Sequence, residues 1–189
     1  MRIQILIRSA IVGALLCLSG CQTLQWKEGG TPYTAKDGSF TIQIPSGWTY
    51  AEERGGHIVG TRDGFLLQRI LLEKRELKEA LPYSKRVLNP GLTPLELAEA
   101  IIDDARADRM LLGIEIAENQ PETLGGKPGF KLVINFHTAD KLRVSEEVIG
   151  CIQGDHLYLL VFSAPTRFYF GRDRAAFEEG AKMFQFTKP

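Results

Sequence analysis

"HLYLLVFSA", residues 156–164, is the stretch that decides the fold. Apolar residues occupy both alternating sets of positions, so both faces of a strand here would be buried. A strand with two buried faces belongs in the middle of a sheet that is covered on both sides. The sequence therefore predicts a central strand with layers packed against each of its faces.

The segments before this strand have the pattern of antiparallel neighbours. Gly154-Asp155 is a tight hairpin turn, and the cluster at 124–129 is rich in glycine and proline, which mark turns. In residues 130–137, apolar and polar side chains alternate, which is typical of a strand. Strands are therefore expected at 114–123, 130–137, 141–153 and 156–164.

A helix is expected over residues 94–110. Thr93-Pro94-Leu95-Glu96 has a capping threonine, proline at the first helical position and glutamate at the third, which is a capping box. The apolar face should comprise Leu95, Ala98, Ile102 and Ala105, with Leu97 and Ile101 beside them. A second helix should follow Asp173 as its cap, with an apolar stripe of Phe177, Ala181 and Phe184.

The first part of the domain reads as further strands. Phe40, Ile42 and Ile44 alternate with polar residues, and extended segments should follow at 48–50, 56–62 and 65–76. The last of these is ambiguous, because its leucine and glutamate content also suits a helix. Residues 80–92 read as a loop. Strands with one inserted and one terminal helix predict an α+β fold, with helices covering an antiparallel sheet.

Residues 1–20 have the features of an export signal. Arg2 and Arg8 are the only charges, and residues 9–19 form an uncharged, mostly apolar run. That run is too short to cross a bilayer, which needs about 20 apolar residues. The alternative interpretations are an ordinary signal peptide or a buried helix.

Leu18-Ser19-Gly20-Cys21 resembles the bacterial lipobox, a branched residue and two small ones before a cysteine. In that family a diacylglycerol is attached to the cysteine thiol, the chain is cut before the cysteine, and the new amine is acylated. Two or more acyl chains anchor a protein stably. Gln22 is not acidic, so enterobacterial-type sorting would place the protein in the outer membrane, facing the periplasm.

These observations divide the chain into a signal peptide (1–20), a lipidated N-terminus and tether (21–36) and a domain (37–189). Cys17 would leave with the signal and Cys21 would carry lipid, so Cys151 would be the only free thiol and no intramolecular disulfide could form. The net charge of the whole chain is zero, which gives no charge-based reason to expect nucleic acid or an anionic membrane surface as a partner.

Four stretches, in order, resemble the PsbP-like superfamily. DGSFTIQIPSGW (37–48) resembles its opening, and LTPLELAEAII (92–102) resembles its mid-domain helix. LGGKPGFKLVI (124–134) resembles its Gly-x-Pro-Gly/Ala hairpin, and residues 156–186 resemble its closing strand and helix. The resemblance covers about residues 36–188.

This superfamily includes extrinsic photosystem proteins, a Ran-binding nuclear protein and bacterial lipoproteins. The resemblance implies an α/β/α sandwich around an antiparallel sheet. It also implies a non-enzymatic module that binds or helps to assemble envelope proteins. It supplies no catalytic residue, and we expect no cofactor other than the acyl chains on Cys21.

Candidate chemical groups are few. His57, His137 and His156 have no second ligand at metal spacing, although a site that joins His137 and His156 in space remains an alternative. Cys151 reads as a small buried residue. The neighbouring acids should be solvated, because side chains next to each other in sequence diverge: Glu52-Glu53, Asp103-Asp104, Glu146-Glu147 and Glu178-Glu179.

Residues 167–174 interleave arginine with aromatic side chains. Exposed aromatics and arginine are enriched where proteins meet, and an exported protein is not expected to meet nucleic acid. We expect this segment to connect into the last helix, with Phe168 or Phe170 packed against the domain. If two of its aromatics are exposed beside the arginines, it becomes a candidate partner surface, formed by Arg167, Phe168, Phe170 and Arg172. Two alternatives stay open: small-ligand or metal binding in a pocket at the sheet edge, and an unrecognised hydrolase with a nucleophile and base brought together by the fold.

Overall fold

The computed structural model describes residues 24–187, so the predicted signal and the lipobox Leu18 to Cys21 lie outside the described residues. Within 24–187, eight strands form one sheet in the order β1-β4-β5-β6-β10-β9-β8-β7, and three form a second in the order β11-β3-β2. The strands are β1 Lys27–Glu28, β2 Pro32–Thr34, β3 Phe40–Gln43, β4 Thr49–Glu52, β5 Ile58–Thr61, β6 Arg69–Glu76, β7 Leu112–Leu124, β8 Lys127–His137, β9 Arg143–Gln153, β10 His156–Pro165 and β11 Gln185–Phe186. Every pair of neighbouring strands is antiparallel.

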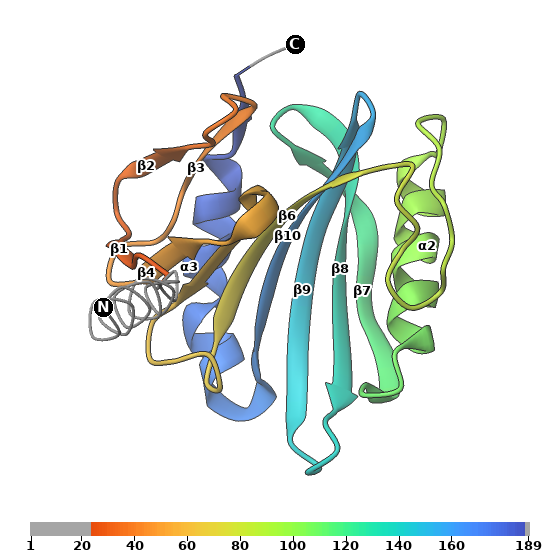
Figure 1. Cartoon of the computed structure of the whole chain (residues 1–189). Coiled ribbons are helices and arrows are strands. Elements are labelled where there is room, and N and C mark those ends of the chain that lie inside the picture. The colour runs from red at the N-terminus through yellow and green to blue at the C-terminus, as the bar shows by residue number, and fades with distance from the viewer. Residues whose placement is uncertain (1–23, 188–189) are drawn as a thin grey trace, which may run out of the picture.

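The helices lie on opposite faces of the large sheet (Figure 1). Helix α3 (Gly171–Lys182) and the small sheet cover one face, while α2 (Pro94–Ala107) and the loop before it cover the other. This arrangement confirms the predicted α/β/α sandwich. No helix within residues 24–187 is long and apolar enough to span a membrane.

Strand β10 is central and buried on both faces, as its sequence predicts. Tyr158, Leu160 and Phe162 pack in the core under α3. Leu157 and Leu159 pack in the core under α2. The alternation follows from the two-residue period of a strand, so two separate cores share this one strand.

Helix α2 begins as the capping box predicts. The backbone N–H of Glu96 donates to Oγ1 of Thr93 at 3.3 Å, and the N–H of Thr93 donates to Oε2 of Glu96 at 2.8 Å. Leu97, Ala98 and Ile102 are buried. Leu95, which was expected on the same face, is 64% exposed because it lies in the first turn beside the edge strand β7.

The segment expected as a tether is instead part of the domain from Lys27 onward. Strand β1 pairs with β4 and β2 pairs with β3. Between them, the N–H groups of Gly29 and Gly30 donate to the carbonyls of Trp48 and Ile44 at 2.7 and 2.8 Å. The two glycines therefore turn the chain between β1 and β2, Pro32 is the first residue of β2, and Tyr33 is buried. The ambiguous segment 65–76 contains strand β6, which begins at Arg69.

Candidate functional site

Three connections meet at one end of the large sheet. They are residues 62–68 between β5 and β6, 138–142 between β8 and β9, and 166–170 between β10 and α3. Antiparallel pairing brings them together, because Arg69 lies opposite Ser163 and Pro165 lies opposite Val144. Figure 1 shows these loops at the lower end of the sheet.

A hollow of about 240 Å³ opens between these connections. Apolar side chains dominate its lining, with Arg69, Ser163, Thr138 and Asp140 among its polar members. Leu66, on its rim, is 92% exposed, and Phe65 and Leu142 are also exposed. Large apolar side chains that gather in the open are more informative about binding than single exposed leucines.

Two further aromatic side chains extend this surface. The ring of Trp26 lies 5.3 Å from that of Phe65, centroid to centroid, and Trp26 is 44% exposed. Phe168, which follows the hollow-lining Pro165 by three residues, is 59% exposed. We call the surface formed by Trp26, Phe65, Leu66, Leu142 and Phe168 the apolar end.

Ion pairs fix the loop 62–68 to the start of α3. The carboxylate of Asp173, which is 1% exposed, accepts hydrogen bonds from Arg62 at 3.0 Å and from Gln68 at 3.1 Å. Arg172 bridges Asp173 and Asp63 at 2.6 and 2.5 Å. The hydrogen bond from Arg172 lowers the pKa of Asp63 below its usual value. The loop that carries Phe65 and Leu66 is therefore held in place by charges.

The predicted capping role of Asp173 is wrong. A single π-helical turn, Thr166–Phe170, precedes α3, and the helix begins at Gly171. Asp173 therefore lies inside the first turn rather than before it. Its carboxylate bonds with the side chains of Arg62, Gln68 and Arg172, which sequence spacing could not reveal.

The structure divides the predicted partner residues into two groups. Arg167 and Phe168 are exposed. Phe170 is not at the surface, because its ring stacks on Phe162 at 5.5 Å within the core. Arg172 lies over the ring of Phe168, 5.4 Å from its centroid, while its guanidinium also bonds with acids. This segment therefore contributes Phe168 and Arg167 to the surface.

A charge cluster around the buried carboxylate of Glu147 lies between the large sheet and α3. Arg174 bonds with Glu147 at 2.6 Å and with both carboxylate oxygens of Glu118 at 2.9 Å. Glu178 lies 3.3 Å from the Nε of Arg174, and Lys131 lies 3.5 Å from Glu178. The cluster joins β7, β8 and β9 to the helix.

The expectation that the acid pairs are solvated is wrong for two of them. The side chain of Glu147 has no exposed surface, and burial raises its pKa to about 7. Burial also raises the pKa of Glu146, which faces the opposite side of the sheet. Asp104 is buried and accepts hydrogen bonds from the N–H groups of Tyr83 and Ser84 at 3.0 and 2.7 Å. These partners come from distant segments, so adjacent acids in the sequence do not reveal them.

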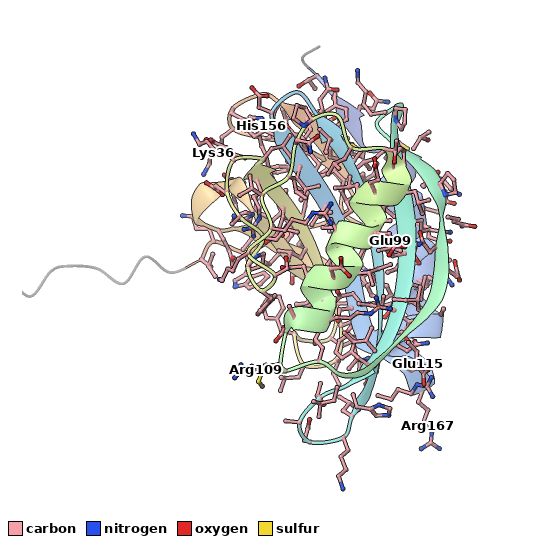
Figure 2. The ribbon with its side chains drawn as sticks, turned by 90° about the vertical axis from the view of Figure 1, so that its right-hand side faces the viewer. Lys36, Glu99, Arg109, Glu115, His156 and Arg167 are labelled. Atoms are coloured by element: carbon pink, nitrogen blue, oxygen red, sulfur yellow. The ribbon has the colours of Figure 1, made fainter. Side chains whose placement is uncertain are left out.

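A second hollow, of about 290 Å³, has both charged and apolar side chains in its lining. It lies toward the other end of the sheet, where Figure 2 shows Lys36 and His156. Lys74 bonds with Asp37 at 2.5 Å, and Lys36 pairs with Glu52 at 3.1 Å. The hydrogen bond from Lys74 lowers the pKa of Asp37 to about 2. The charges of this hollow therefore pair with one another.

The structure does not join the histidines into a site. His137 pairs across its hairpin with Arg143, whereas His156 lies opposite Gln153 at the other end of the same sheet. Within residues 24–187, no group of three side chains is arranged to hold a metal ion. Cys151 is fully buried, as predicted, and burial raises its pKa to about 12.

Comparison with known proteins identifies the architecture. No protein-family model matches the sequence, and no curated protein matches it. The solution structure of PsbP (CyanoP) from Synechocystis superposes with a TM-score of 0.52 at 15% identity, covering 90% of this chain and 99% of that one. The chain has the PsbP-like fold.

Two other solved structures share this PsbP-like fold. The Ran-binding protein Mog1p of Saccharomyces cerevisiae has a TM-score of 0.56 at 10% identity, with 88% of this chain and 97% of that one covered. LpqN of Mycobacterium tuberculosis, described as involved in cell envelope biogenesis, has a TM-score of 0.54 at 16% identity, with 88% and 93% covered. A protein of Bacteroides thetaiotaomicron (TM-score 0.54, 11% identity) is longer, and this chain, 85% covered, spans 49% of its length.

Proposed function

We propose that this protein is a lipid-anchored module of the cell envelope, which binds or helps to assemble envelope proteins and does not catalyse a reaction. The anchor would be a diacylglycerol and an N-acyl chain on Cys21, in the outer membrane facing the periplasm. The PsbP-like fold supports a binding role, because it is shared with a Ran-binding protein and with a protein involved in envelope biogenesis.

The observation that carries the proposal is the short distance between the lipobox and the domain. Leu24 follows Cys21 by three positions, and the first paired strand begins at Lys27. An extended chain spans at most about 3.5 Å per residue, so the anchor would hold the domain directly at the membrane. A module placed there can act on partners at or in the membrane, and not on distant ones.

Lipid labelling tests the anchor. Cells that express the wild-type chain, Cys21→Ala or Cys17→Ala receive a fatty-acid precursor that can be detected on the protein. We expect Cys21→Ala to lose the label, while the Cys17→Ala control keeps it because Cys17 is discarded with the signal. Equal labelling of wild type and Cys21→Ala would overturn the proposed anchor.

Crosslinking in cells tests the binding role. We expect the wild-type chain to capture a reproducible set of envelope proteins, and Cys21→Ala to lose that set because it is no longer held at the membrane. Capture of the same set by both proteins would contradict a role that depends on the membrane.

The second hollow gives weaker support to ligand binding, because its charged groups already pair with one another.

A further inference from the structure

Leu66 is almost wholly exposed, although it belongs to a loop that is firmly held. Five ionic and polar groups tie this loop to α3: Arg62, Asp63 and Gln68 on the loop, and Arg172 and Asp173 on the helix. An apolar side chain in a flexible loop could fold back against the protein, but this one is kept in the open. The fold therefore presents Leu66 outward together with Phe65 and Trp26.

The composition of the apolar end suits the boundary between lipid and water. Trp26 has an apolar ring with one polar N–H, the kind of side chain that concentrates at membrane interfaces. Phe65, Leu66, Leu142 and Phe168 offer apolar area that can enter the acyl boundary. A closed pocket for one small molecule would bury these side chains, whereas here Phe65, Leu66 and Leu142 line an open hollow.

Two basic side chains without an ion pair lie beside the apolar end. Lys141 and Arg167 are exposed beside Leu142 and Phe168, and neither forms an ion pair with any residue between 24 and 187. Of the nearby acids, Asp63 is paired with Arg172, and Asp140, which lines the hollow, accepts a hydrogen bond from the hydroxyl of Thr138. Figure 2 shows Arg109 and Arg167 at this end of the molecule, away from Lys36 and His156. Lysine and arginine side chains close to an anionic membrane surface are attracted to it.

The start of the chain lies beside this surface. Trp26 touches Phe65, and it follows Leu24 by only two positions. From Cys21 to Trp26 the chain can extend by at most about 18 Å. A lipid on Cys21 would thus keep the apolar end within reach of the headgroup layer.

We infer that the apolar end is a membrane-docking surface that inserts Trp26, Phe65 and Leu66 among anionic phospholipids. This inference rests on the proposed lipid anchor, and it assigns lipid rather than protein as the contact of Phe168 and Arg167. Docking orients the domain, so that protein partners meet the faces that point away from the membrane.

The two tryptophans make the test direct. Trp48 is 1% exposed and packs on Phe162, so only Trp26 can respond to lipid. The full chain is expressed in bacteria, purified, and reconstituted into vesicles of phosphatidylethanolamine and phosphatidylglycerol, some of which carry brominated acyl chains. We expect the brominated lipid to quench the emission of Trp26, and Trp26→Phe to abolish the quenching.

Matched leucine variants distinguish insertion of the apolar end from quenching that arises only because the anchored Cys21 holds Trp26 near the bilayer. Leu66→Asp should lose most of the quenching, while Leu95→Asp, which changes an exposed leucine on α2, should keep it. Lys141→Ala combined with Arg167→Ala should reduce quenching in the anionic vesicles. Absence of quenching in the wild-type protein, or equal quenching in the Leu66→Asp variant, would overturn the inference.

The failure of docking can be distinguished from the failure of the anchor. The mass of the purified protein reports whether Cys21 carries lipid, whatever the emission of Trp26 shows. A photoreactive amino acid in place of Phe168 then identifies what touches this surface in cells. Adducts with phospholipid support docking, and adducts confined to a protein would show that this end binds a protein instead.

Discussion

The Nε atom of Arg174 donates a hydrogen bond of 2.6 Å to Oε2 of Glu147, a carboxylate with no exposed surface. The bond joins α3 to β9 across the core. The second carboxylate oxygen of Glu147 has no partner within the described residues, so its charged form is poorly solvated there. This is why burial raises the pKa of Glu147 to about 7.

Replacing Glu147 with glutamine should change how stability depends on pH. An unfolded glutamate titrates near pH 4.5, so the folded protein binds more protons than the unfolded chain between about pH 4.5 and 7. The contribution of Glu147 to the free energy of unfolding is fully present below pH 4.5 and is lost as the pH rises through 7. Relative to wild type, Glu147→Gln should therefore gain up to about 3 kcal/mol between pH 4.5 and 8. Urea unfolding of both proteins at both pH values measures this gain. If the free energies of unfolding of variant and wild type differ by the same amount at pH 4.5 and pH 8, the prediction is contradicted.

Replacing Arg174 with methionine should destabilise the protein, and most strongly at high pH. Its loss leaves Glu147 buried without a positive partner, which costs about 3 kcal/mol when the carboxylate is charged. The cost should be smaller at pH 5, where Glu147 takes up a proton. Arg167→Met is the control, because an exposed arginine without an ion pair should change the free energy of unfolding by less than about 0.5 kcal/mol. Equal costs for Arg174→Met at pH 5 and pH 8 would show that Glu147 is not the reason.

Two glycines of α3 should respond differently to alanine. Gly171 has helical backbone angles, and the position that a Cβ atom would take there is surrounded by open space, so Gly171→Ala should stabilise the domain by about 0.5 kcal/mol. A Cβ atom on Gly180 would lie 2.8 Å from the carbonyl oxygen of Gln43, so Gly180→Ala should destabilise it by about 1–3 kcal/mol. Thermal unfolding of the two variants gives the comparison. Stabilisation by both would mean that α3 does not pack closely on β3.

Thiol counting checks both the signal and the core. The processed, lipidated protein should have one reactive thiol in denaturant, that of Cys151, whereas an unprocessed chain would have three. In the folded protein Cys151 should react far more slowly than in the unfolded protein, because burial raises its pKa to about 12. An aromatic disulfide reagent at pH 8 measures both quantities. Fast reaction without denaturant would show that the core around Cys151 opens readily.

The main elements of the fold could be predicted where local chemistry decides them. The two-sided apolar pattern of 156–164 predicts the central strand, and Thr93 with Glu96 predicts the start of α2. The first strands escaped prediction, because β1 and β2 are short and exist only through pairing with β4 and β3. Their glycines and proline, taken alone, are equally typical of a tether.

The candidate site depends on contacts that a linear pattern does not contain. Phe65, Leu142 and Phe168 come from three separate connections, and only the antiparallel order of the strands brings them to one end. Phe170 looks equivalent to Phe168 in the sequence, yet the π-helical turn directs it into the core. Glu147 is paired with an arginine 27 residues later in the chain.

The strand shared by the two cores has a consequence for how the domain comes apart. Loss of the α2 layer would expose Leu157 and Leu159, and loss of the α3 layer would expose Tyr158, Leu160 and Phe162 on the same strand. Unfolding of either the α2 layer or the α3 layer therefore exposes apolar side chains of β10 to water. The domain should therefore unfold in a single all-or-none transition. Forced unfolding in the cell, for example by a protease that pulls on the chain, would then meet one large free-energy barrier and not a series of small ones.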